Sequence, residues 1–235
     1  MSDAPVSDSL KRAQQRLIEA LENAGRSSQD AHLLAVSKTK PATLIREAYA
    51  CGQREFGENY LQEALDKQAE LADLQDIVWH FIGPLQSNKT RAVAEHFSWV
   101  HSVDRIKIAR RLSEQRPDAL GPLNICLQVN VSAESSKAGI PPGELDALAD
   151  EIATLPNLHL RGLMAIPAPA TDLASQRQPL GHLRNLQEGL RQRLPDAPLD
   201  TLSMGMSDDL EAAILEGATL VRLGTAIFGA RESHR

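Results

Sequence analysis

Short apolar segments alternate with segments of helical periodicity along almost the whole of this 235-residue chain. Most of the intervening segments place leucine or alanine at i, i+3 and i+4, as amphipathic helices do. Neighbouring parallel strands need crossover connections of this kind, so the pattern predicts a parallel sheet. The candidate strands are residues 33–37, 55–58, 78–83, 99–103, 124–131, 159–166, 201–205 and 219–224.

Eight strand–helix units in about 200 residues fit a closed (β/α)8 barrel, the TIM barrel. A further amphipathic segment, residues 7–24, precedes the first strand and predicts an extra N-terminal helix. No linker rich in glycine, proline or serine divides the chain, so we expect a single α/β domain over residues 1–235. An open, doubly wound sheet is the alternative. It is less favoured because no G-x-G-x-x-G motif follows the first strand, where a dinucleotide site needs it.

Composition excludes several functional classes. The formal net charge of −6 at pH 7 argues against nucleic acid as a partner. The N-terminus lacks the apolar core of a signal peptide, and no apolar run approaches the roughly 18 residues of a membrane span. We therefore expect a cytoplasmic protein with no membrane partner. No set of His, Cys and Asp residues has the spacing of metal ligands, so no metal site is expected.

Two cationic residues stand in unusual places relative to the candidate strands. Lys38 directly follows the first strand, and Arg222 lies within the apolar eighth strand. Barrel enzymes place their active sites at the carboxyl ends of the strands. Lys38 is either an ordinary surface residue or an amine made nucleophilic in a desolvated pocket. Arg222 is either half of a structural ion pair or part of the same site.

The segments after the seventh and eighth strands predict a phosphate site. SMGMSDD (203–209) and LGTAIFG (223–229) each combine glycine with a hydroxyl just before an expected helix start. Free N–H groups at helix starts bind anions, and these two loops are the usual phosphate site of the barrel. Ordinary strand–helix turns use the same residues and are the alternative.

A lysine nucleophile facing a phosphate site indicates a Schiff base with a phosphorylated aldehyde, for which pyridoxal 5'-phosphate is the obvious candidate. An arginine at the ring nitrogen of that cofactor, the role open to Arg222, would keep the nitrogen unprotonated. The cofactor would then be a weaker electron sink than one paired with aspartate. An aldolase-type barrel that uses Lys38 on a sugar phosphate is a further alternative, without a cofactor.

Eight motifs extend this prediction to a family. They are AVSKTKP, FGENYLQEA, WHFIGPLQSNK, HSVD, SSKAGI, GLMAI, LSMGMSDDLEAAI and TLVRLGTAIFG. With these motifs, the chain resembles the pyridoxal phosphate homeostasis proteins from about residue 8 to 231. That family in turn resembles the N-terminal barrel domain of alanine racemase (fold type III).

The resemblance implies that the chain binds pyridoxal 5'-phosphate, with Lys38 as the Schiff-base residue. It also implies that the phosphate is held by Ser203, Gly224 and Thr225.

The resemblance places the remaining implied residues around the cofactor ring. Arg222 would contact the pyridine nitrogen, Asn59 and Met164 would lie near the ring, and His80 would support the pocket. The implied role is intracellular cofactor homeostasis and delivery to apoenzymes, with an indirect effect on amino-acid and keto-acid balance and no robust reaction of the chain's own.

A single-domain pyridoxal-phosphate enzyme, such as an amino-acid racemase, is the alternative function. It needs a second general base, for which His80, His101 and Tyr60 are weak candidates. Alanine racemase carries a second domain whose tyrosine, from a partner subunit, serves as that base. This chain ends at Arg235, soon after the eighth strand, so we expect no such domain and a monomer. The loop Ser135–Ser136–Lys137 is a candidate for a second anion site.

Overall fold

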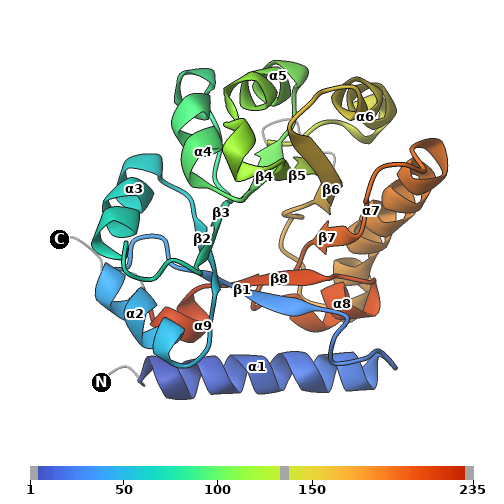
Figure 1. Ribbon diagram of the computed structural model, residues 1–235. Coiled ribbons are helices and arrows are strands. Elements are labelled where there is room, and N and C mark those ends of the chain that lie inside the picture. The colour runs from blue at the N-terminus through green and yellow to red at the C-terminus, as the bar shows by residue number, and fades with distance from the viewer. Residues whose placement is uncertain (1–4, 133–137, 231–235) are drawn as a thin grey trace.

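A closed barrel of eight parallel strands is the centre of the computed structural model, which describes residues 5–132 and 138–230 (Figure 1). The strands pair in chain order, and β8 pairs with β1 to close the barrel. This closure confirms the predicted TIM barrel and excludes the open sheet. The strands are β1 (His32–Val36), β2 (Glu55–Glu58), β3 (Val78–Phe81), β4 (Trp99–Val103), β5 (Leu123–Gln128), β6 (Leu158–Met164), β7 (Thr201–Ser203) and β8 (Leu220–Leu223).

Helices surround the barrel in the order that the sequence pattern predicts (Figure 1). The α-helices are α1 (Val6–Asn23), α2 (Ala42–Ala50), α3 (Leu61–Glu70), α4 (Thr90–His96), α5 (Ile106–Gln115), α6 (Leu145–Ala153), α7 (Leu173–Arg193), α8 (Leu210–Leu215) and α9 (Thr225–Phe228). Short 3-10 turns occupy Ser87–Lys89, Asp118–Leu120 and Pro142–Glu144.

The predicted N-terminal helix is present as α1, which lies along the outside of the barrel against α2, α8 and α9 (Figure 1). Its leucines at positions 10, 17 and 21, spaced seven and then four residues apart, are buried on one face, as in an amphipathic helix. Arg16, on its other face, pairs with Glu211 of α8 at 2.7 Å. The helix therefore covers the seam where the first and last strands meet.

Several strands are shorter than the apolar runs predict. β5 ends at Gln128 because Val129 pairs separately with Ile140. β7 ends at Ser203, and Gly205 then turns the chain with a left-handed φ of 101°. The remaining residues of these two apolar runs belong to the loops that form the barrel mouth.

The strand pleat divides side chains between two environments, since successive residues face opposite sides of a strand. One set packs outward in the main core, between strands and helices. The other set faces the barrel interior, where Trp99, Cys126 and Met164 form a separate small cluster. Polar residues whose side chains also face inward, among them His80 and Arg222, therefore lie inside the barrel and are buried.

Gly162 of β6 is needed for the close approach of two strands. A Cβ atom there would lie 1.6 Å from the carbonyl oxygen of Thr201, its partner on β7. We expect Gly162→Ala to lower the free energy of unfolding by at least about 2 kcal/mol, as overpacking in a core does.

Gly189→Ala is the matched control, because a Cβ at this position of α7 meets open space. It should raise stability by up to about 1 kcal/mol, since alanine favours the helix more than glycine does. Urea unfolding followed by circular dichroism measures both changes. Equal midpoints for the two variants would contradict this account of the β6–β7 contact.

Candidate active site at the barrel mouth

Lys38 lies two residues beyond the end of β1, on the side of the barrel where all strands have their carboxyl ends. Its side chain is partly buried, whereas the preceding Ser37 is fully buried. Thr39 has a left-handed φ of 66°, which is uncommon for a residue with a branched side chain. Its N–H group donates to Glu63 Oε1 at 2.6 Å. The backbone around Lys38 is thus held in a specific, partly strained conformation.

Lys67 of α3 is the centre of a buried network beneath this backbone. Its Nζ donates to the Ser37 carbonyl oxygen at 2.7 Å and to Glu58 Oε1 at 2.8 Å. It also pairs with Glu63 at 2.9 Å. The Ser37 hydroxyl donates to Glu58. Lys67 binds Ser37 and Glu63 binds Thr39, the residues on either side of Lys38, so this network fixes where Lys38 leaves the barrel wall.

Arg222 of β8 extends its guanidinium group inside the barrel. One terminal nitrogen donates to Ser203 Oγ at 2.7 Å, and the other donates to the Ala165 carbonyl oxygen at 3.0 Å. Burial lowers the pKa of Arg222 to about 10, so the group remains protonated at neutral pH. A guanidinium has five N–H donors, so these two contacts leave capacity for a further acceptor.

The structure places the other predicted residues at different depths. Gly224 directly follows β8 at the mouth, where a Cβ would lie 3.3 Å from the Val36 carbonyl oxygen of β1, and Thr225 is exposed beside it. Met164 is fully buried in the barrel interior. Asn59 follows β2, and its Oδ1 is buried with no hydrogen-bond partner among the described residues. An orphaned buried amide oxygen at a strand end is a feature that a bound group can satisfy.

His80 and Ser203 lie deeper than the sequence suggested. His80 contacts His101 and Glu55 inside the barrel. The Ser203 hydroxyl is bonded to His101 as well as to Arg222. The structure therefore joins these two predicted residues through a third, His101.

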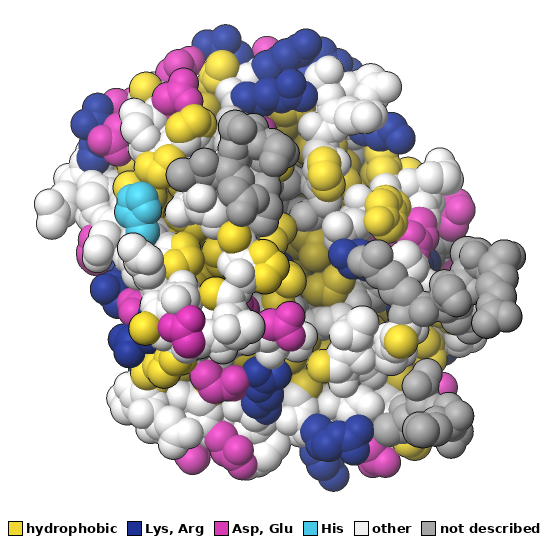
Figure 2. Space-filling view, turned by 180° about the vertical axis from the view of Figure 1, so that it is seen from behind, with side chains coloured by type: hydrophobic (Ala, Val, Ile, Leu, Met, Phe, Trp, Pro, Cys, Tyr) yellow, Lys and Arg dark blue, Asp and Glu magenta, His cyan; other side chains and the backbone are white. Residues whose placement is uncertain are grey.

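The residues at the mouth fit pyridoxal 5'-phosphate in chemical type. They include a primary amine at Lys38, a buried cationic donor at Arg222 and the orphaned amide oxygen of Asn59. An aldehyde, an aromatic nitrogen and a ring hydroxyl are the groups of the cofactor that match them. The space-filling view in Figure 2 shows a surface hollow walled in large part by hydrophobic side chains, as small-molecule sites are.

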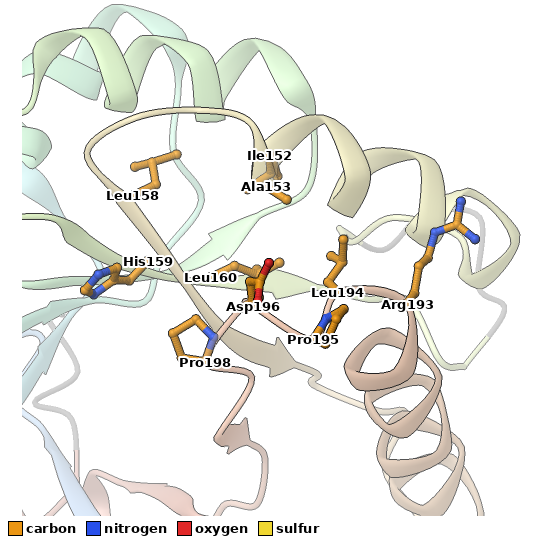
Figure 3. Close-up of a pocket in the computed structure, with 11 residues that line it drawn as sticks. Ile152, Ala153, Leu158, His159, Leu160, Arg193, Leu194, Pro195, Asp196 and Pro198 are labelled. Carbon is orange, nitrogen blue, oxygen red and sulfur yellow. The ribbon is translucent and has the colours of Figure 1, made fainter.

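A separate pocket of about 370 Å³ lies away from this site (Figure 3). Its walls include Leu158 and His159, at the amino-terminal end of β6, and Pro195 and Asp196, in the loop between α7 and β7. It thus opens at the end of the barrel opposite Lys38, where barrel residues serve stability.

Other sequence expectations concern metals, membranes and a second anion site. In the described ranges, no group of three or more His, Cys, Asp or Glu side chains could hold a metal ion. None of the helices that the structure describes is long and apolar enough to cross a bilayer. The candidate loop Ser135–Ser136–Lys137 lies outside the described residues.

The sequence did not single out the network residues Glu55, Lys67, Ser37 and Glu63. It offered His101 only as a weak candidate base, not as a link to Ser203. Glu55 and His101 occupy strand positions whose side chains face the barrel interior. A charged or polar residue at such a position was the sequence signal that could have identified them. No such sequence signal marked Lys67, because a lysine within a helix is usually exposed.

The geometry defines a closed barrel with a lysine just beyond the end of β1 and a buried arginine on the neighbouring β8. The matching family model is the alanine racemase N-terminal domain, over residues 13–232. Pyridoxal phosphate homeostasis proteins match over nearly full length. The one from Pseudomonas aeruginosa is 62% identical, covering 97% of this chain and 96% of that protein. The one from Escherichia coli K12 is 52% identical, covering 97% of each. This chain belongs to the pyridoxal phosphate homeostasis protein family.

Solved structures agree with this assignment. PipY of Synechococcus elongatus with pyridoxal phosphate bound has a TM-score of 0.81 and 42% identity, covering 91% of this chain and all of that one. Alanine racemase from Corynebacterium glutamicum has a TM-score of 0.69 at 16% identity, covering 95% of this chain and 61% of that enzyme. This second likeness concerns the fold alone.

Replacing Lys67 tests the network beneath Lys38. Lys67→Met should lower the free energy of unfolding by about 3–5 kcal/mol, because it leaves the buried Glu58 carboxylate without its partner. Arg110→Met is the control, since Arg110 and Glu151 form an exposed pair and its loss should cost less than about 1 kcal/mol. Chemical unfolding measures both. A similar cost for the two variants would show that the buried network contributes little.

Glu55 predicts a pH dependence of stability. Burial opposes its ionisation, but hydrogen bonds from His32 and His80 outweigh burial and lower its pKa from 4.5 to about 2. A carboxyl group whose pKa is depressed in the folded state stabilises the fold above its unfolded pKa. That stability is lost as the pH falls from about 4.5 to about 2. Across this pH range, the free energy of unfolding of Glu55→Gln should therefore depend less on pH than that of the wild type. Parallel curves would contradict the depressed pKa.

Proposed function

We propose that this chain binds pyridoxal 5'-phosphate as a Schiff base on Lys38 and serves cofactor homeostasis rather than catalysis. The observation that carries the proposal is the placement of Lys38 and Arg222. Lys38 follows β1 by two residues, and Arg222 lies on β8, the strand that pairs with β1. The names of the relatives and the cofactor in the PipY structure support it.

Lys38 would act through its Nζ atom. The neutral amine adds to the cofactor aldehyde, a C=N bond forms, and the carbonyl oxygen leaves as water. The network around Lys67 would hold the Lys38 backbone so that the amine faces the hollow. When bound, the cofactor supplies an electron sink for substrate carbanions.

Arg222 would donate an N–H group to the pyridine nitrogen. Because the guanidinium stays protonated, the ring nitrogen would act as acceptor and remain unprotonated, which weakens the electron sink. Asn59 would offer its Oδ1 to the ring hydroxyl, and Met164 would lie beneath the ring. His80 would support the pocket from within the barrel.

The loops after β7 and β8 would hold the phosphate. The first N–H groups of a helix have no acceptor within that helix, and α9 begins at Thr225, directly after Gly224. Ser203 stays a predicted phosphate residue. To donate to a phosphate, its hydroxyl would first have to leave His101.

The arrangement of possible bases favours a carrier over an amino-acid racemase. His80 and His101 are fully buried and bonded to each other, so neither faces the hollow. Tyr60 is 49% exposed beside the mouth and is the base that the racemase alternative would use. Apoenzymes as recipients of the cofactor, and the effect on amino-acid and keto-acid balance, belong to the same proposal. The monomeric state and the cytoplasmic location stay predictions.

The absorbance spectrum tests the Schiff base. Wild-type protein with pyridoxal 5'-phosphate should show a band near about 420 nm that disappears on borohydride reduction. Lys38→Ala should lose the band. Lys40→Ala, in the same loop, should keep it, because Lys40 Nζ bonds the Ala230 carbonyl oxygen instead.

Two results would count against the proposal. A band that survives Lys38→Ala would assign the aldehyde to another amine. A wild-type protein without a band, but with borohydride-trapped sugar phosphate on Lys38, would support the aldolase alternative.

A further inference from the structure

A continuous chain of buried hydrogen bonds runs through the barrel interior from the mouth toward the opposite end. Arg222 donates to Ser203 Oγ at 2.7 Å. Ser203 Oγ lies 2.8 Å from His101 Nδ1, and His101 Nε2 lies 2.8 Å from His80 Nδ1. His80 Nε2 lies 3.0 Å from Glu55 Oε1. The three middle residues come from β7, β4 and β3 and are fully buried.

An ionised Glu55 and two neutral imidazole rings, with Arg222 as a donor only, together fix the direction of every bond along this chain. Arg222 can only donate, and an ionised Glu55 can only accept. His80 must therefore donate from Nε2, which leaves its Nδ1 as an acceptor. His101 then donates from Nε2 and accepts at Nδ1. Ser203 consequently donates its hydroxyl proton to His101 and offers only lone pairs to Arg222.

The charges around the two imidazole rings agree with this direction. Burial lowers the pKa of His80, and burial together with nearby charges holds the pKa of His101 well below its usual 6.5. Both rings are then neutral, as one donor and one acceptor per ring require. His32 also bonds Glu55, at 2.9 Å from its half-exposed ring, which keeps the carboxylate ionised.

We propose that Glu55, His80 and His101 are positioning residues that act through Ser203 to hold Arg222 in place for the cofactor ring nitrogen. This inference rests on the proposed function. The chain commits the Ser203 proton to His101, so Ser203 is an acceptor for one Arg222 nitrogen and does not donate to the phosphate. The phosphate contacts would then come from Gly224 and Thr225. With the second nitrogen held by Ala165, the guanidinium plane is fixed and its other donors point in a set direction.

The direction of the chain can be measured in the full-length, ligand-free protein. Nitrogen-15 NMR of labelled histidine distinguishes the two neutral tautomers from the cation. At neutral pH, we expect both His80 and His101 to be neutral and protonated at Nε2. An Nδ1-protonated or cationic ring at either position would overturn the proposed direction.

Glu55→Gln tests the effect on Arg222. An amide can donate as well as accept, so it no longer fixes the direction of the chain. We expect mixed tautomers at His80 and His101, a shifted pyridoxal phosphate band, and cofactor affinity lowered by about tenfold, as for a weakened bond to a charged group. Glu151→Gln, at an exposed ion pair, should match the wild type in all three.

The combined outcomes separate this inference from the proposed function. In one outcome, the wild type binds the cofactor and Glu55→Gln shows the same tautomers, absorbance band and affinity as the wild type. This result would overturn the positioning role and leave the proposed function intact. In another outcome, the wild type shows the expected tautomers but gives no absorbance band with added pyridoxal 5'-phosphate. The missing band would overturn the proposed function, and with it the positioning role that rests on that function.

Discussion

A guanidinium group inside a closed barrel needs hydrogen-bond acceptors, and the burial of Arg222 shapes the rest of the site. The β8 pleat turns this side chain inward, where water cannot solvate it. Ser203 and the Ala165 carbonyl oxygen supply the acceptors. Arginine suits this position because it stays charged when buried, whereas a buried lysine readily loses its proton. The Ser203 hydroxyl in turn needs an acceptor, which His101 provides. His101 contacts His80, and His80 contacts Glu55, so the buried polar network extends as far as Glu55.

Barrel closure brings this interior chain beside a second polar network. β1 and β8 are neighbours, so the loop that carries Lys38 and the buried Arg222 belong to the same part of the barrel. Lys67 and Glu58 fix the loop that carries Lys38, while Ser203 fixes Arg222 from within. Among the described residues, the hydrogen-bond partners of Lys67 and Glu58 are different from those of Ser203 and Arg222. The backbone that carries Lys38 and the Arg222 guanidinium are thus held by separate networks, as a preorganised site requires.

Much of this arrangement follows from local sequence patterns. The alternation of apolar and helical segments predicts the closed barrel, because strand and helix periods depend only on neighbouring residues. Strand ends such as those of β5 and β7 were less predictable, since tertiary pairing and the left-handed Gly205 decide them. The depth of Ser203 and the role of Glu55 depend on register across several strands, which a single segment does not encode.

The central claim is that Lys38 is the residue that binds the cofactor aldehyde. Its most direct test is peptide mapping by mass spectrometry of the wild-type protein after incubation with pyridoxal 5'-phosphate and reduction with borohydride. The account predicts one phosphopyridoxyl group per chain, on the peptide that contains Lys38. Label spread over surface lysines, or absent from that peptide, would contradict it.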